Sequence, residues 1–276
     1  MMSLRIFIIN LFIFLGQRTF IGRGKLRALI IKIIRIIIFK NSSENHIQKD
    51  FTVSILGVPF VFFIDKLIGY KVYFCRSERK EILFIKKKIT DNTVFFDIGA
   101  NMGIYTQIVA SSFDKIKNST IIAIEPDPLN CFRIKQNLRL LEKKIPNIFN
   151  LVKIEECGVG DSNKEMYLNK SYGPANGIVI ESHEKNSIKI KVKTLLEIIE
   201  VNKISHITCL KIDIEGYEDK CLLPFFNNAS KKLYPDNIII EAALGNLWSV
   251  NIIDYLKSIG YKIFYSSAAN MILRLK

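Results

Sequence analysis

From Val94 onward, short apolar runs alternate with amphipathic stretches of helix length. The apolar runs have the length of buried strands and read VFFDI, TIIAIEP, LVKIEECGVG, ITCLKIDIE and NIIIEA. This alternation is typical of a parallel sheet that helices cover on both faces. We therefore expect a doubly wound α/β fold, in which ligands bind at the carboxyl ends of the strands.

Three other segments depart from this alternation. The segment FTVSILGVPFVFFID predicts a small hairpin around Gly57. Between Gly160 and Leu195, short strand-like pieces flank a region rich in glycine and proline, which indicates an inserted hairpin or lid. The closing segments YKIF and MILRL predict two antiparallel strands at the edge of the sheet.

The amino-terminal forty residues hold eight basic residues and no acidic residue, whereas the rest of the chain is only mildly basic. Leu26 to Phe39 predicts a cationic amphipathic helix, which either lies in a membrane interface or packs on the domain with its basic side chains in water. The apolar run Ile6 to Gly16 is shorter than the roughly 20 residues that span a bilayer. We expect residues 1–45 to be a basic amphipathic extension and residues 46–276 to be the α/β domain.

Charge and cysteine content exclude several classes of function. A mildly basic domain without a recognition motif argues against a nucleic-acid partner. The five cysteines show no CxxC or Cys/His spacing, so we expect neither a disulfide framework nor a metal site.

The sequence has no cleavage site of a signal peptide, and it therefore indicates a cytoplasmic protein. Peripheral contact with the anionic inner face of the membrane through residues 1–40 stays open.

The loop after the first strand of the alternating region carries the strongest motif, D-x-G-x-N-x-G from Asp97 to Gly103. Gly99 permits a tight turn, and Gly103 permits a ligand to approach the backbone. A dinucleotide needs an anion site and the pattern GxGxxG, but here a carboxylate comes directly before the turn. Asp97 would repel a diphosphate and would pair with the ammonium group of S-adenosylmethionine. The alternative is that Asp97 only caps the following helix.

Acidic residues also follow the next two strands. Glu125 stands where an acid accepts hydrogen bonds from the ribose hydroxyls of a nucleotide, and Pro126 and Asp127 extend the same predicted cofactor site. Asp161 follows the third strand. It is a candidate to receive the amine of adenine, and it is equally a good turn residue.

The fourth strand reads LKIDIEGYE, and strand periodicity places Lys211, Asp213 and Glu215 on one side. Charges on a buried strand are costly unless they are paired or used. One interpretation is an ion pair between Lys211 and Asp213 that holds the sheet edge. In the other, Asp213 and Glu215 are catalytic and orient a substrate hydroxyl or take its proton.

The blocks VFFDIGANMGIYTQIVA, AIEPDPLNCFRIKQNL and LKIDIEGYE resemble the three signature blocks of FkbM-type methyltransferases. The resemblance covers roughly Phe51 to the carboxyl end. It implies the Rossmann-like, seven-stranded sheet of class I methyltransferases and O-methylation of a hydroxyl on a sugar, glycan, polyketide or similar small molecule. The motif positions that carry over are the cofactor loop, the ribose acid and the block after the fourth strand: Asp97, Gly99, Asn101, Gly103, Glu125, Asp213 and Glu215.

We therefore expect a methyltransferase that uses S-adenosylmethionine and needs no metal, because the reactivity comes from the cofactor and the protein supplies alignment. Three alternatives remain. A catalytically silent protein would bind the cofactor without turnover. A dinucleotide-dependent oxidoreductase is disfavoured by Asp97 and by the absence of GxGxxG. A nucleic-acid methyltransferase would need a basic groove and a block of the N/D-P-P-Y type, which is not seen near Asp213.

Overall fold

The computed structural model describes residues 51–62, 78–170, 178–180 and 183–276. The chain divides into two compact units, Met1–Arg79 and Lys80–Lys276. In the first unit, β1 (Phe51–Ile55) and β2 (Val58–Phe62) form an antiparallel pair, which confirms the predicted hairpin. Its turn is made by Leu56 and Gly57, both with positive φ. The predicted helix Leu26–Phe39 and the predicted boundary at residues 45 and 46 lie outside the described residues.

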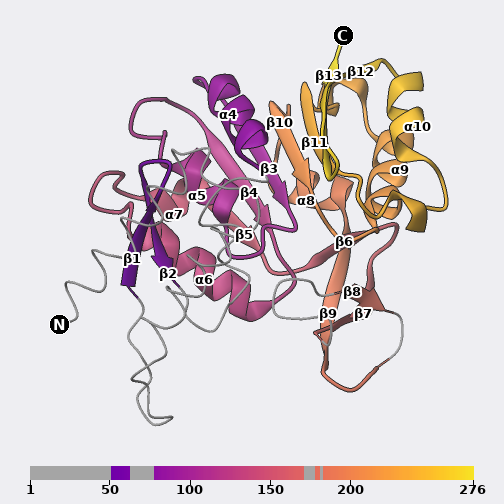
Figure 1. Cartoon of the computed structure of the whole chain (residues 1–276), viewed down its shortest axis with the longest axis horizontal. Helices are drawn as coiled ribbons and strands as arrows, with labels where there is room; N and C mark the ends of the chain where they lie inside the picture. The colour runs from indigo at the N-terminus through magenta and orange to yellow at the C-terminus, as the bar shows by residue number, and fades with distance from the viewer. Residues whose placement is uncertain (1–50, 63–77, 171–177, 181–182) are drawn as a thin grey trace, which may run out of the picture. The chain divides into compact units, whose positions relative to one another are not determined.

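The second unit alternates strands with helices, as the sequence predicts (Figure 1). Its first half contains, in chain order, α4 (Arg79–Lys88, which begins at the unit boundary), β3 (Val94–Ile98), α5 (Ile104–Ala110), β4 (Thr120–Ile124), α6 (Pro128–Arg139), α7 (Ile148–Leu151), β5 (Val152–Glu155) and β6 (Gly158–Gly160). Its second half contains β7 (Lys164–Asn169), β8 (Ile178–Ile180), β9 (Ser187–Thr194), α8 (Leu195–Val201), β10 (Cys209–Ile212), α9 (Glu218–Asn228), η1 (Lys231–Leu233), β11 (Asn237–Glu241), η2 (Gly245–Leu247), α10 (Ile252–Ser258), β12 (Tyr261–Ser266) and β13 (Asn270–Leu275).

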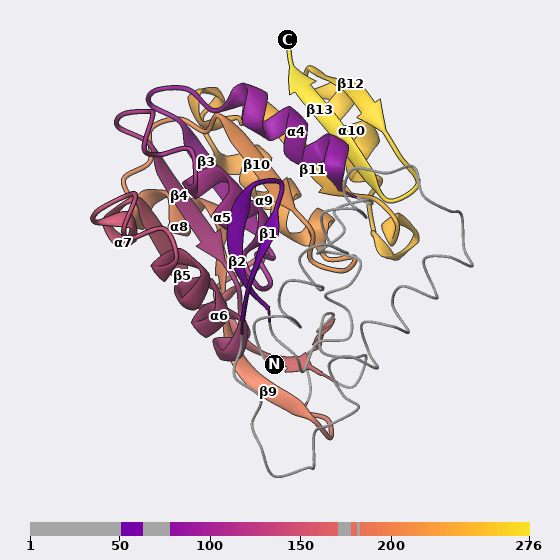
Figure 2. The same cartoon turned by 60° about the vertical axis from the view of Figure 1, so that its left-hand side comes forward.

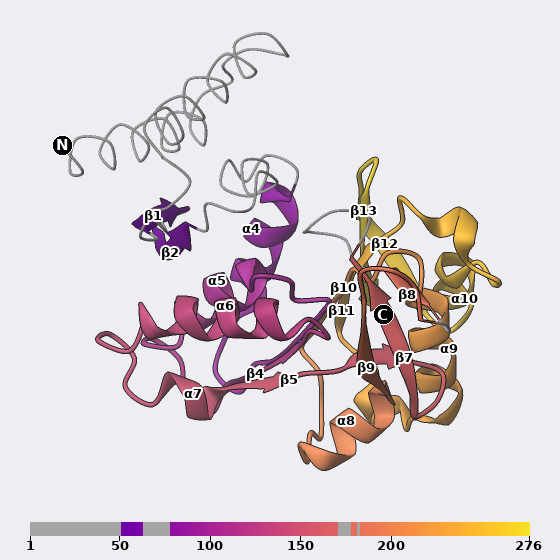
Figure 3. The same cartoon turned by 90° about the horizontal axis from the view of Figure 1, so that it is seen from below.

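The main sheet has seven strands in the order β12-β13-β11-β10-β3-β4-β5. The pairs from β11 to β5 are parallel, and β13 runs antiparallel to both of its neighbours. Helices α5 and α6 cover one face of this sheet and α8 covers the other (Figures 2 and 3). The doubly wound, mostly parallel seven-stranded sheet and its antiparallel closing strands are therefore confirmed.

The inserted hairpin between Gly160 and Leu195 is also confirmed, as an antiparallel pair of β7 with β9. It belongs to a second sheet with the order β6-β9-β7-β8. The sequence analysis took LVKIEECGVG as one strand, and this was wrong. The chain leaves the main sheet after Glu155, and β6 pairs with β9 instead of β4. Gly158 and Gly160 allow this pairing, because a Cβ at Gly158 would crowd the side chains of Ile190 and Val192, and a Cβ at Gly160 would stand 2.9 Å from the side chain of Val192.

One hydrophobic core cluster lies between the main sheet and the helices α8, α9 and α10. Strand side chains such as Phe96, Leu210 and Ile238 are fully buried against helix side chains such as Leu222 and Phe225. Burial of this kind stabilises each large apolar side chain by roughly 1.5–3 kcal/mol. The core thus fixes the carboxyl ends of β3, β10 and β11, from which the polar loops emerge. Within the described residues, no helix combines the length and the apolar composition needed to cross a bilayer.

Candidate active site

The loop after β3 turns sharply and is fixed to the neighbouring strand. The backbone N–H groups of Gly99 and Ala100 both donate to the carbonyl of Ile124 at 3.0 Å. Gly99 has φ +71, and a Cβ at this position would stand 1.9 Å from the backbone oxygen of Asp213. The predicted need for glycine in a tight turn is therefore confirmed. Glycine is needed here because the loop after β3 touches the loop after β10 at this point.

Gly103 precedes α5 with φ +83. A Cβ here would meet the Cγ1 of Ile134 at 2.9 Å. The sequence predicts that Gly103 leaves space for a ligand, whereas the structure fills this space with the side chain of Ile134 from α6. Gly103 therefore permits close packing of α5 on α6. Asn101, the other predicted position of this loop, is half-buried and has φ 52.

Asp97 is fully buried at the end of β3. Its Oδ2 accepts hydrogen bonds from the backbone N–H of Thr106 at 3.0 Å and from the hydroxyl of Thr106 at 2.6 Å. Its Oδ1 lies 3.7 Å from the Nζ of Lys211 and accepts no hydrogen bond from any residue that the structure describes. The capping role that the sequence left as an alternative is thus present in the geometry. Pairing of Asp97 with a cofactor ammonium stays a prediction, with Oδ1 as the available atom.

Glu125 follows β4 directly and is buried. Its Oε2 accepts from the backbone N–H of Asn101 at 2.8 Å. Its Oε1 accepts from the N–H of Asp127 at 3.0 Å and from the side-chain amide of Asn130 at 3.2 Å. Burial raises the pKa of Glu125, although these hydrogen bonds act in the opposite direction. The carboxylate links the two predicted cofactor loops.

The remaining predicted cofactor residues surround this acid. Asp127 caps α6 by accepting from the N–H of Leu129 at 3.0 Å, and it also pairs with the Nζ of Lys170 at 2.9 Å. Pro126 is half-buried between Glu125 and Asp127. Asp161 is exposed after β6 and accepts from Ser162 and Lys164. These contacts are the turn chemistry expected from the second interpretation of Asp161, and an adenine contact at Asp161 stays a prediction.

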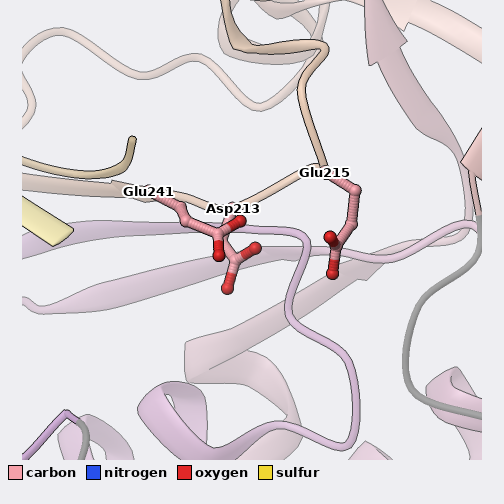
Figure 4. A group of neighbouring side chains, drawn as sticks. All are labelled: Asp213, Glu215 and Glu241. Carbon is pink, nitrogen blue, oxygen red and sulfur yellow. The ribbon is translucent and has the colours of Figure 1, made fainter. Parts of the chain in front are cut away.

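The other group of polar side chains lies at the carboxyl ends of β10 and β11. The prediction that Lys211, Asp213 and Glu215 share one strand face was wrong, because β10 ends at Ile212 and Glu215 has φ 57. The left-handed turn nevertheless brings the acids together. Asp213, Glu215 and Glu241 offer carboxylate oxygens that all lie within 4.8 Å of one another (Figure 4). We call these three residues the acid cluster.

Glu241 was not among the residues that the sequence analysis selected. It ends β11, and its neighbour Ile240 pairs with Ile212 of β10, so Glu241 lies beside Asp213. The signal was available, because NIIIEA is the parallel strand that follows LKIDIE along the chain. Glu218 was also missed. Its carboxylate accepts from the backbone N–H of Ile214 at 2.9 Å and from the indole of Trp248 at 2.7 Å, which fixes the loop that carries the acid cluster.

Burial and repulsion from neighbouring carboxylates raise the pKa values of two members of the acid cluster, Glu215 and Glu241. Burial and the neighbouring carboxylates Asp213 and Glu218 raise the pKa of Glu215 to about 7, although Lys211 lowers it. Burial and a shared hydrogen bond with Asp213 raise the pKa of Glu241 further. Three such oxygens could hold a cation, but Lys211, whose Nζ is 3.7 Å from Asp213, already supplies positive charge. The expectation of no metal stays a prediction.

A glutamine at position 241 is expected to make the protein more stable at alkaline pH. A raised pKa stabilises the fold below the ordinary value of 4.5, and this contribution is lost as the pH rises through the folded-state value. Glu241→Gln removes that loss. We expect wild type and variant to unfold alike near pH 5 and the variant to be more stable by about 1 kcal/mol near pH 9. Chemical denaturation at both pH values measures this difference.

The control is Glu165→Gln, because Glu165 is an exposed acid on β7. It should change the unfolding free energy equally little at both pH values. A Glu241→Gln protein whose stability follows the wild-type pH dependence would show that Glu241 titrates normally.

Comparison with known proteins identifies the family. Residues 97–263 match the model of the methyltransferase FkbM domain. No curated protein matches the chain. The solved structures found include the methyltransferase FkbM from Methylobacillus flagellatus, with 17% identity, a TM-score of 0.47 and coverage of 76% of this chain and 52% of that protein. This chain therefore spans about half the length of that relative.

Two other solved structures show similarity at a comparable or lower level. CalS11, a TDP-rhamnose 3'-O-methyltransferase in calicheamicin biosynthesis, has 11% identity and a TM-score of 0.46, with coverage of 92% of this chain and 96% of that protein. TrmK from M. capricolum, in complex with S-adenosyl-homocysteine, has 16% identity and a TM-score of 0.39, with coverage of 70% and 66%. The family match spans β3 to β12, which includes the loop at Asp97 and the acid cluster. This chain has the Rossmann-like fold of class I methyltransferases and belongs to the FkbM methyltransferase family.

Proposed function

We propose that this protein is an S-adenosylmethionine-dependent O-methyltransferase that acts on a hydroxyl of a sugar, glycan or other small molecule. The observation that carries the proposal is the contact between the two loops. Gly99 of the cofactor loop packs directly on the backbone of Asp213, so the cofactor loop and the acid cluster adjoin. Methyl transfer needs this arrangement, because the methyl donor and the acceptor oxygen must meet in line.

The residues after β3 and β4 fit S-adenosylmethionine. Asp97 Oδ1 is a buried carboxylate oxygen that accepts no hydrogen bond within the described part of the chain, which suits the ammonium group. Glu125 lies at the carboxyl end of the adjacent strand, where the ribose hydroxyls would bind, with Pro126 and Asp127 beside it. When bound, this cofactor supplies an electrophilic methyl group on a sulfonium. The protein needs only to bind and orient it.

The acid cluster supports the acceptor side of the proposal. An acid acts best as a general base when its pKa is near the working pH, and burial beside Asp213 raises the pKa of Glu215 to about 7. In our proposal, Glu215 takes the proton of the acceptor hydroxyl as the oxygen gains the methyl group. Asp213 accepts a hydrogen bond from the same or a neighbouring hydroxyl. Adjacent hydroxyl donors are the chemistry that sugars offer to such carboxylates.

The alternative is a protein that keeps the cofactor site without turnover. Both proposals require S-adenosylmethionine binding, so binding is the first test. We would titrate wild type with S-adenosylmethionine and S-adenosylhomocysteine by calorimetry and repeat both titrations with Glu125→Ala. Loss of a charged hydrogen-bond acceptor should weaken both affinities roughly ten- to hundredfold.

The matched control is Glu142→Ala, because Glu142 is an exposed glutamate to which the proposal gives no role. It should bind both ligands like wild type. If folded wild-type protein binds neither ligand, the proposed function fails, and the dinucleotide alternative returns.

A further inference from the structure

Lys211 is a buried lysine between the two halves of the proposed site. Its side chain is 7% exposed. The Nζ donates to the carbonyl of Gly99 at 2.8 Å and lies 3.4 Å from the carbonyl of Ile98. The same atom is 3.7 Å from Asp97 Oδ1 and 3.7 Å from Asp213 Oδ2. One ammonium thus contacts the cofactor loop on one side and the acid cluster on the other.

The sheet places Lys211 in this position. Lys211 of β10 pairs in register with Asp97 of β3, and Asp213 follows two residues later. The ring of Tyr105 from α5 lies 5.6 Å from the Nζ and covers it. A buried ammonium costs free energy unless carboxylates and carbonyls surround it, and here they come from both loops. The sequence left open an ion pair with Asp213 alone, whereas the structure adds Asp97 and Gly99.

We propose that Lys211 is a positioning residue that holds the cofactor loop and Asp213 at a fixed separation and sets the charge of the acid cluster. This proposal rests on the proposed function, since it assigns the two contacts to the cofactor side and the acceptor side of one reaction. Lys211 does not touch the reacting atoms. Its effect passes through the Gly99 carbonyl and the Asp213 carboxylate.

Two effects of Lys211 can be measured without knowing the acceptor. Removing the ammonium frees the Gly99 carbonyl, which loosens the loop that binds the cofactor. Removing it also takes away the cation that lowers the pKa of Glu215, while Asp213, Glu218 and Glu241 still face that group. A side chain with a purely structural role would not shift the titration of Glu215.

The test uses Lys211→Met in the full-length protein, with two readouts. Calorimetry with S-adenosylhomocysteine should show an affinity roughly tenfold below wild type. The carboxyl carbon signals of protein labelled with ¹³C-glutamate give the titration midpoint of Glu215, assigned by the signal that Glu215→Gln loses. This midpoint should move to higher pH than in wild type. The matched control is Lys220→Met, because Lys220 also pairs with a buried aspartate, Asp219 at 3.6 Å, its Nζ donates to Ser249 at 2.7 Å, and the proposal gives it no role.

Each outcome decides the proposal. If Lys211→Met keeps both the wild-type affinity and the wild-type midpoint, the proposal is overturned. If Lys211→Met does not fold, Lys211→Arg is the test, since arginine keeps the positive charge but has a longer side chain. The proposal then requires a weaker affinity for S-adenosylhomocysteine and a Glu215 titration midpoint near that of wild type. If wild type binds no S-adenosylhomocysteine, the proposed function fails, and the midpoint alone reports whether Lys211 sets the charge of the acid cluster.

Discussion

Replacing Gly99 by alanine is expected to abolish binding of S-adenosylmethionine. The new Cβ would stand 1.9 Å from the Asp213 oxygen and 3.0 Å from the Asp213 carbonyl carbon, and both are backbone atoms that no rotamer change can move. The residue also has φ +71, a conformation that costs a residue with a Cβ roughly 1 kcal/mol. The cofactor loop and the acid-cluster loop must therefore separate. Calorimetry should detect no binding, and melting should show a lowered midpoint.

The hairpin offers a matched control for the backbone strain. Gly57 has φ +83, but a Cβ there would meet no atom of the described residues within 4 Å. Gly57→Ala should therefore bind the cofactor like wild type and lose only about 1 kcal/mol of stability. If Gly99→Ala binds as well as Gly57→Ala does, the contact between the loops does not matter for the cofactor site.

The fold could be predicted because its signals are local. Apolar runs bounded by polar residues revealed the strands, and turn residues revealed the hairpin at Gly57 and the closing strands. The break inside LVKIEECGVG falls at the polar pair Glu155 and Glu156, but the apolar residues on both sides hid it. Glu155 and Gly158 lie in different sheets because β6 pairs with β9, which comes about thirty residues later in the chain. Pairing over this separation depends on tertiary packing, which periodicity does not report.

The site shows a similar division between local and non-local information. The cofactor loop, Glu125, Asp213 and Glu215 stand in short motifs directly after strands, so the sequence was sufficient to select them. Glu241 also ends an apolar strand, but its place beside Asp213 depends on the pairing of β10 with β11. The left-handed backbone conformation of Glu215 could not be predicted from the sequence either, since strand periodicity assumes extended backbone. The partners of Asp97 required the register of β3 with β10.

Asp97→Asn is expected to destabilise the fold strongly. An asparagine oxygen can still accept both hydrogen bonds from Thr106, so the cap of α5 is kept. The amide group would then face the ammonium of Lys211 in place of a carboxylate oxygen, and a buried charge would lose one of its partners. Breaking a buried ion pair in this way costs roughly 3–5 kcal/mol. Urea denaturation at neutral pH measures the change in unfolding free energy.

Two further variants complete this test. Asp161→Asn is the control, because Asp161 is an exposed aspartate whose ion pair contributes little, and it should stay within about 0.5 kcal/mol of wild type. The double variant Asp97→Asn/Lys211→Met should lose less than the sum of the single changes, since it removes both members of the pair. An Asp97→Asn protein with wild-type stability and no cofactor affinity would contradict the role of Asp97 as a stabilising partner of Lys211. It would instead support direct pairing of Asp97 with the ammonium group of S-adenosylmethionine, so stability and binding measured on one variant separate pairing with Lys211 from pairing with the cofactor.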